Sequence, residues 1–209
     1  MHLNHRLWLT AAALLFVSGC ASMSAEECEF SDWYTIGFED GAKGLTSDAI
    51  GERRRACARH GFEVDFAAYQ DGRANGLVEY CQPQRGYNVG NAGYRYNGVC
   101  PKDLEAEFLD AYDIGWQHHR LRDDVNQVDS EINRLSRERD TLREDIATGS
   151  ATLVADDTPK EERIRLVAEL AGMNERLGEI DARMDELAAL RVLREQALYD
   201  FEIDLANSY

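Results

Sequence analysis

The strongest constraint in this sequence is a pair of matched apolar series in its second half. The first series runs from Leu121 to Ile146 and the second from Leu166 to Leu205, each with apolar residues at alternating steps of three and four. That spacing places one apolar stripe along a helix and is typical of coiled coils. Two such helices bury their stripes only by packing against each other or against another chain.

The segment between the two series predicts how they are connected. Residues 148–157 (TGSATLVADD) contain turn-forming residues and break the apolar pattern. Thr158 and Pro159 then resemble the capped start of a new helix. We therefore predict helices over about 101–147 and 159–206, folded into an antiparallel hairpin. Leu153 and Val154 at its tip are candidates for a binding surface.

Two arginines interrupt the second apolar series and predict the register of the hairpin. Folding the chain about the centre of the connecting loop places Arg191 and Arg194 near Asp110 and Asp113. A charged residue at a coiled-coil seam is stabilised by an opposite charge on the facing helix. We therefore expect both arginines to face acids near the start of the first helix.

The N-terminus indicates export. Residues 1–19 combine a weakly basic start with an apolar run that is shorter than the ~20 residues a transmembrane helix needs. We predict that they form a signal peptide. The run ends in Val17-Ser18-Gly19-Cys20, which resembles the lipobox of bacterial lipoproteins, where the cysteine is acylated and becomes the first mature residue. The alternative is an ordinary secretory signal that is cleaved near Ala25.

A lipid on Cys20 would attach the protein to a membrane. By resemblance to the general sorting rule for lipoproteins, Ala21 at the next position points to the outer membrane. The expected location is therefore the bacterial cell envelope, on the outer membrane and facing the periplasm.

The remaining cysteines predict a disulfide framework. With Cys20 assigned to lipid, the chain retains Cys28, Cys57, Cys81 and Cys100. An even number in an oxidising compartment indicates two disulfides, and the absence of a Cys-x-x-Cys pair disfavours a metal site. Sequence alone allows three pairings. Helices predicted over Ser31–Leu45, Ser47–His60 and Asp65–Cys81, running up, down and up, favour Cys28–Cys57 with Cys81–Cys100.

A repeat of tyrosine and glycine runs through the cysteine-containing region. It occurs at Tyr34-Thr-Ile-Gly37, Tyr69-Gln-Asp-Gly72 and Tyr112-Asp-Ile-Gly115, and the first two copies continue to a second glycine four residues on. Glycines four apart share one face of a helix and allow a neighbouring backbone to approach closely. We interpret the repeat as helices packed through small-residue faces. The alternative is an aromatic-lined groove for a ligand.

The stretch Gln82–Cys100 is rich in Gly, Asn and Tyr and predicts an irregular, ordered loop. Its tyrosines, Tyr87, Tyr94 and Tyr96, are candidates for a recognition surface because exposed Tyr supplies contact area and a hydroxyl. The alternative is that they pack over the helices.

Charge and motifs exclude several functions. The chain carries 39 acidic and 23 basic residues, a formal net charge of −16, which disfavours nucleic acid as a partner. The adjacent His118 and His119 point in different directions on a helix and are not a metal-ligand pair. We therefore expect no enzyme activity, no cofactor and no metal. The best enzyme alternative is a cell-wall glycan hydrolase or binder that uses Asp40 and Asp71 as paired carboxylates, together with the tyrosine-rich loop.

Several of these motifs occur together in one known family. These motifs are the lipobox, Trp33-Tyr34-x-x-Gly37, Tyr69-x-x-Gly72-x-x-x-Gly76, Tyr80-Cys81 and Gly98-Val99-Cys100. Together they resemble an uncharacterised family of bacterial lipoproteins that contains a domain of unknown function. The resemblance covers roughly Cys28 to Trp116. It implies an envelope location and brings no activity with it.

Together these patterns predict an all-α protein. Residues 20–100 form a small disulfide-stapled helical module, and residues 101–209 form the long helical hairpin. The expected function is that of a non-enzymatic, lipid-anchored envelope protein with a structural or protein-interaction role. Its expected partners are the membrane, through the lipid, and either an unidentified envelope protein or a second copy bound through the hairpin.

Overall fold

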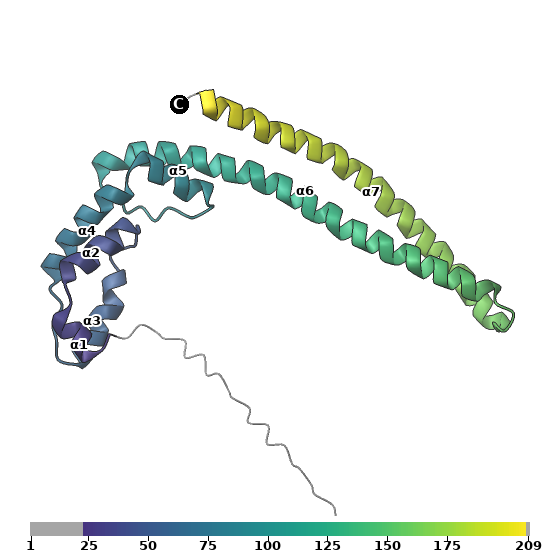
Figure 1. Cartoon of the computed structure of the whole chain (residues 1–209), viewed down its shortest axis with the longest axis horizontal. Coiled ribbons are helices and arrows are strands. Elements are labelled where there is room, and N and C mark those ends of the chain that lie inside the picture. The colour runs from purple at the N-terminus through teal and green to yellow at the C-terminus, as the bar shows by residue number, and fades with distance from the viewer. Residues whose placement is uncertain (1–22, 208–209) are drawn as a thin grey trace, which may run out of the picture. The chain divides into compact units, whose positions relative to one another are not determined.

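The computed structural model describes residues 23–207, and its regular secondary structure over that range consists of seven α-helices with no strands (Figure 1). The predicted all-α class is therefore confirmed. The predicted signal peptide, residues 1–19, and the predicted lipidation site, Cys20, lie outside the described residues. Contacts divide the chain into two compact units, with the division between Glu79 and Tyr80.

The first unit contains four helices, and side chains cap the N-termini of three of them. They are α1 (Ala25–Phe30), α2 (Trp33–Ala42), α3 (Ala49–Arg59) and α4 (Phe66–Tyr80), whose last residue belongs to the second unit. Ser24 forms a capping box with Glu27 before α1. Asp32 accepts hydrogen bonds from the first amides of α2, and Asp65 accepts one from the Ala68 amide in α4. The helix predicted from Ser31 therefore begins two residues later, after a short helix that sequence reasoning missed.

The core of the first unit is small and is closed by a disulfide. The Cys28–Cys57 bond joins α1 to α3. Buried around it is one apolar cluster, which consists of Cys28, Trp33, Ile50, Cys57 and Tyr69. Gly61, which follows the C-terminus of α3, has a φ of +81°, in the left-handed conformation that glycine adopts without strain.

The second unit contains α5 (Pro83–Asn91), α6 (Lys102–Val154) and α7 (Lys160–Asn207). The loop prediction for Gln82–Cys100 was wrong over its first half, which forms α5. Pro83 occupies the first turn of this helix, where its missing N–H costs nothing. The Cys81–Cys100 disulfide joins the residues that precede α5 and α6. Both preferred cysteine pairings are thus confirmed.

Helices α6 and α7 lie side by side as an antiparallel hairpin (Figure 1). The first helix extends to Val154, seven residues beyond its predicted end at Ala147. Gly149, which suggested a turn, lies within the helix, and Leu170 of α7 packs over it: a Cβ at Gly149 would lie 3.0 Å from the Leu170 side chain. The connecting loop is correspondingly short.

One arginine closes this loop. The Arg163 guanidinium of α7 donates hydrogen bonds to the carbonyls of Leu153, Ala155 and Thr158. The Thr158 hydroxyl donates to the Thr152 carbonyl at the end of α6. The Thr152 and Leu153 carbonyls at the C-terminus of α6 are therefore satisfied by side chains of the loop and of α7.

The longer α6 shifts the register of the hairpin. Arg191 donates to Asp129 at 2.7 Å and Arg194 to Asp124 at 2.9 Å, so the expected contacts with Asp110 and Asp113 were wrong. The principle behind that expectation was correct, since both seam arginines face acids on the other arm. The apolar seam is nevertheless continuous, and its buried centre consists of Val128, Leu135, Ile180 and Leu187. None of the helices within residues 23–207 is both long enough and apolar enough to cross a membrane.

Candidate functional site

The tyrosine and glycine repeat of the first unit is a close helix contact. A Cβ atom at Gly37 or Gly41 of α2 would overlap backbone atoms of α4, and a Cβ at Gly72 or Gly76 of α4 would overlap backbone atoms of α2. The two helices thus approach through reciprocal glycine faces, as the spacing predicted. The interpretation as core packing fits this geometry, and the glycines leave no groove between the two backbones.

The second unit repeats this arrangement with different residues. Gly86 and Gly90 of α5 face the backbone of α6, and Gly115 of α6 faces the backbone of α5 at Tyr87 and Asn91. Sequence reasoning identified Gly115 as a repeat glycine but missed its partners on α5. The signal was present, because Gly86 and Gly90 have the same spacing of four as the glycines in α2 and α4.

Each glycine-packed pair has its own disulfide. In the first unit, Cys28 and Cys57 lie in the segments that precede α2 and α4. In the second unit, Cys81 and Cys100 directly precede α5 and α6. The cysteine-containing region therefore contains two helix pairs built to one plan, with a covalent bond where the paired helices begin.

A buried charged network occupies the first unit. Asp40 is only 1% exposed. Its carboxylate accepts hydrogen bonds from two guanidinium nitrogens of Arg53, and it accepts a third from the Tyr69 hydroxyl at 3.0 Å. Burial, followed by the hydrogen bond to Asp40, raises the pKa of Tyr69 to about 12. The hydrogen bond to Asp40 also raises the pKa of Arg53. Sequence reasoning missed both partners of Asp40.

The two aspartates proposed as a carboxylate pair have different environments. Asp71 is exposed on α4 and takes no part in the Asp40 network. Asp40 is enclosed by an arginine and a tyrosine, whose hydrogen bonds make it a structural anchor. This geometry gives no support to a shared substrate between the two carboxylates.

A second network joins the three helices of the second unit at the base of the hairpin. The Tyr87 hydroxyl of α5 lies 2.7 Å from His118 Nδ1 of α6, and His118 Nε2 lies 3.1 Å from Glu202 of α7. In the neutral tautomer that satisfies both contacts, Tyr87 donates to Nδ1 and the Nε2 proton is donated to Glu202. The Phe201 ring packs beside the imidazole. His118 therefore fixes the C-terminal end of α7 to the two other helices.

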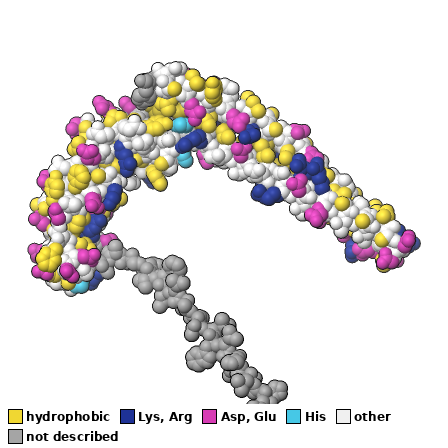
Figure 2. Space-filling model, viewed as in Figure 1, with side chains coloured by type: hydrophobic (Ala, Val, Ile, Leu, Met, Phe, Trp, Pro, Cys, Tyr) yellow, Lys and Arg dark blue, Asp and Glu magenta, His cyan; other side chains and the backbone are white. Residues whose placement is uncertain are grey.

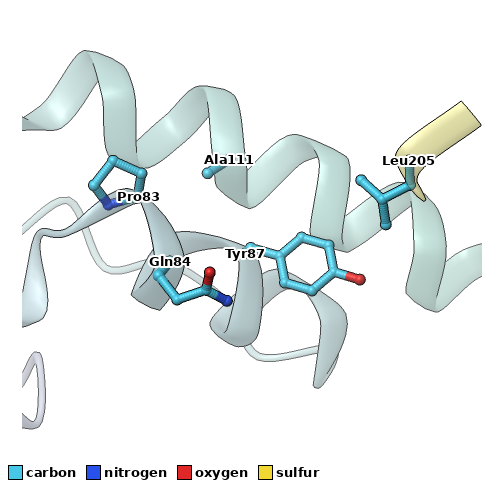
Figure 3. A pocket seen from close by; sticks show the side chains of 5 residues that line it. All are labelled: Pro83, Gln84, Tyr87, Ala111 and Leu205. Carbon is cyan, nitrogen blue, oxygen red and sulfur yellow. The ribbon is translucent and has the colours of Figure 1, made fainter. Parts of the chain in front are cut away.

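A cavity of about 300 Å³ opens next to this network. It is lined by Pro83, Gln84, Tyr87, Ala111 and Leu205 (Figure 3). Tyr87 projects from α5 toward Leu205 of α7, so one side chain borders both the cavity and the histidine network. Because both nitrogens of His118 already have partners, the network positions helices and offers no unoccupied base.

The predicted recognition tyrosines divide into two groups. Tyr94 is 69% exposed. Tyr96 is half-buried: its hydroxyl donates to Glu105, accepts a hydrogen bond from the Cys100 amide, and its ring packs on Phe108. Tyr87 is half-buried in the network just described. The structure therefore does not bring the three tyrosines together as one exposed surface.

The other residues predicted as candidates for binding or metal sites also have different environments. At the tip of the hairpin, Val154 is 74% exposed, whereas Leu153 is half-buried. His119 packs against Trp116 and takes no part in the His118 network. Within residues 23–207, no cluster of three or more His, Cys, Asp or Glu side chains has an arrangement that could hold a metal ion.

Comparison with known proteins finds a family model that matches part of the chain. Residues 32–117 match a family model described as protein of unknown function (DUF2799). The match begins just before α2 and ends within α6, so it includes both glycine-packed helix pairs and excludes most of the hairpin. Searches of the curated proteins and of the solved structures each returned no match. The expected resemblance to a domain of unknown function is thereby shown, and it brings no activity.

Proposed function

We propose that the protein is a lipid-anchored lipoprotein of the bacterial envelope that acts as a non-enzymatic structural or protein-interaction module. In this proposal Cys20 carries the lipid, and the outer membrane holds the protein on its periplasmic side. The sequence Val17-Ser18-Gly19-Cys20 supports the anchor. The disulfides Cys28–Cys57 and Cys81–Cys100 are consistent with an oxidising compartment.

The length of the hairpin is the observation that best supports the proposed interaction role. Its helices contain 53 and 48 residues, and at 1.5 Å per residue the arm is about 70 Å long. Most of this length lies beyond the matched family region and is stabilised by one apolar seam. Such an arm suits contact with a partner at a distance from the base of the hairpin.

The polar networks favour binding over catalysis. Asp40 is held by Arg53 and Tyr69, and His118 is held by Tyr87 and Glu202. A general base must lie within about 3 Å of the group whose proton it abstracts. Asp40 and His118 instead form hydrogen bonds to protein partners at such distances. Their arrangement is the one expected of structural anchors.

Replacement of Cys20 tests the anchor. Cells that express Cys20→Ser should lose the acylated N-terminal peptide in mass spectrometry, and the protein should leave the membrane fraction. Ser22→Ala is the matched control and should remain acylated and membrane-bound. A wild-type protein that begins near Ala25 without lipid would overturn the lipoprotein proposal.

Crosslinking from the tip tests the interaction role. A photoreactive amino acid at Val154 should give one discrete adduct with an envelope protein in cells. The same amino acid at Asp140, on the exposed side of the α6 shaft, is the control and should not give that adduct. Turnover of wall glycan by the purified protein, lost in Asp40→Asn, would instead favour the hydrolase alternative.

A further inference from the structure

The C-terminal half of α7 has a second apolar face that the hairpin does not bury. Val192, Tyr199 and Ile203 follow helical spacing on one side of the helix and are 64%, 59% and 44% exposed, respectively. Leu193 lies beside them and is 67% exposed. Hydrophobic side chains reach the surface of the hairpin between charged ones in Figure 2. We call these four residues the outer stripe.

The outer stripe lies opposite the seam. At 100° per residue, Leu187, Leu198 and Leu205 lie within about 20° of one another on the seam side, and the residues of the outer stripe lie about 120–160° away from Leu187. Leu187 is 2% exposed, which confirms that the seam side is the buried one. The large exposed apolar residues on α6 are limited, within the described chain, to Val154 at the tip. The two arms therefore differ, and only α7 presents an apolar stripe outward along its shaft.

The charged residues around the outer stripe are mostly acidic. Residues 185–207 contain six acidic and two basic side chains, a formal net charge of −4. Both basic residues are already paired: Arg191 with Asp129 of α6 and with Glu195, and Arg194 with Asp124 of α6. Asp200 accepts a hydrogen bond from Gln196, a neutral side chain. The rim of the stripe is thus acidic, and its arginines are directed to the partner arm.

We infer that the outer stripe binds an amphipathic helix with basic flanks from another protein, which adds a third helix to the hairpin. Apolar knobs of that helix would cover the stripe, and its Lys or Arg residues would face the acidic rim. A second copy of this chain would place acidic rims opposite each other, and an anionic lipid surface would be repelled as well. This inference rests on the proposed interaction role and names the surface and the chemistry of its partner.

A designed peptide tests the inference without knowledge of the natural partner. The probe is a fluorescent three-heptad peptide with leucine at positions a and d and lysine at e and g, used at a concentration at which it is monomeric. A matched peptide carries glutamate in place of every lysine. The protein is used from Ala21 onward, which retains all described residues. Fluorescence anisotropy should detect binding of the lysine peptide, weakened by added salt, and no binding of the glutamate peptide.

Two pairs of substitutions locate the contact. The double variant Tyr199→Ser and Ile203→Ser should weaken binding of the lysine peptide by about tenfold or more, since these two side chains form the C-terminal half of the stripe. Ile164→Ser with Val167→Ser is the control, because these residues are also exposed on α7 but lie near the tip. All four residues are exposed, so circular dichroism should show that both variants keep the wild-type fold.

Several outcomes would overturn the inference. They are equal binding of the two peptides, equal loss in the control variant, and unchanged binding after Tyr199→Ser with Ile203→Ser. A dimer in sedimentation that the same double variant abolishes would assign the stripe to a second copy instead. None of these results bears on acylation at Cys20 or on crosslinking at Val154, so failure of the inference is distinguishable from failure of the proposed function.

Discussion

At the scale of single residues, the most informative positions are glycines whose missing side chain is required by a neighbouring backbone. At Gly115 a Cβ atom would lie 2.8 Å from the Asn91 amide nitrogen and closer still to the Tyr87 carbonyl. At Gly178, in the middle of α7, no atom lies within 4 Å of the same position. The same residue type therefore has opposite effects at two sites in one unit.

This contrast predicts opposite effects of one substitution. Gly115→Ala should destabilise the second unit by about 1–3 kcal/mol, because backbone atoms cannot rotate away from the new methyl group. Gly178→Ala should stabilise it by about 0.5–1 kcal/mol, because alanine favours helix and meets open space. Denaturant unfolding of the two variants checks both signs. A stabilised Gly115→Ala protein would contradict the close helix contact.

The Tyr69 hydroxyl predicts a loss of stability at high pH. Its pKa is raised from 10.0 to about 12 by burial and by the hydrogen bond to Asp40. A group whose pKa is higher in the folded state contributes stability below its unfolded pKa and loses it as the pH rises through the folded one. The free energy of unfolding should therefore decline between about pH 10 and 12.

Replacement of the tyrosine isolates this contribution. Tyr69→Phe should lose about 1 kcal/mol at neutral pH and then decline less steeply than wild type between pH 10 and 12. Tyr34→Phe, at a 40% exposed tyrosine of the same unit, should keep the wild-type decline. The measurement is denaturant unfolding over a pH series. Identical pH profiles for Tyr69→Phe and wild type would refute this role of the hydroxyl.

At the scale of elements, the hairpin depends on one narrow seam. Ile180 is 1% exposed within this seam, whereas Val192 is 64% exposed on the opposite side of the same helix. Ile180→Ala should cost about 2–5 kcal/mol, since the surrounding side chains cannot fill the space that is left. Val192→Ala should change stability by less than about 0.5 kcal/mol. Thermal unfolding compares the two, and similar costs would mean that the outer stripe is buried in solution.

The elements also separate what sequence can predict from what it cannot. The hairpin was predictable because its apolar spacing extends over many turns, and the cysteine pairing followed from the order of the helices. The end of α6 was not predictable, because Gly149 favours a turn locally, whereas in the folded hairpin Leu170 packs over it. Helix α5 was missed because local composition favours a loop, while Gly86 and Gly90 are helical through contact with α6.

The candidate site was less predictable than the fold for the same physical reason. Asp40 was chosen from its repeat position, but its role depends on Arg53, thirteen residues away, and on Tyr69, twenty-nine residues away. His118 and Glu202 are separated by 84 residues and meet only in the observed register. No local sequence pattern indicates partners that are so far apart in the chain.

At the scale of the whole molecule, the division into two units predicts that the second can fold alone. Residues 80–209 contain their own disulfide, their own glycine-packed pair and the complete hairpin. A fragment of these residues should give a helical circular dichroism spectrum, a cooperative unfolding transition and an intact Cys81–Cys100 bond by peptide mapping. A fragment that is unfolded, or helical without a cooperative transition, would show that the first unit is required.

The reciprocal glycine contacts also determine how this sequence tolerates change. At Gly37, Gly72, Gly86 and their equivalents the obstacle to a side chain is backbone, which no compensating substitution on the facing helix can remove. On the exposed faces of the hairpin, most substitutions replace one solvated side chain with another. A saturation mutagenesis library selected for folding should therefore be nearly invariant at these glycines and permissive along the arm. Sequence drift would then preserve the module and freely reshape the surface that meets a partner.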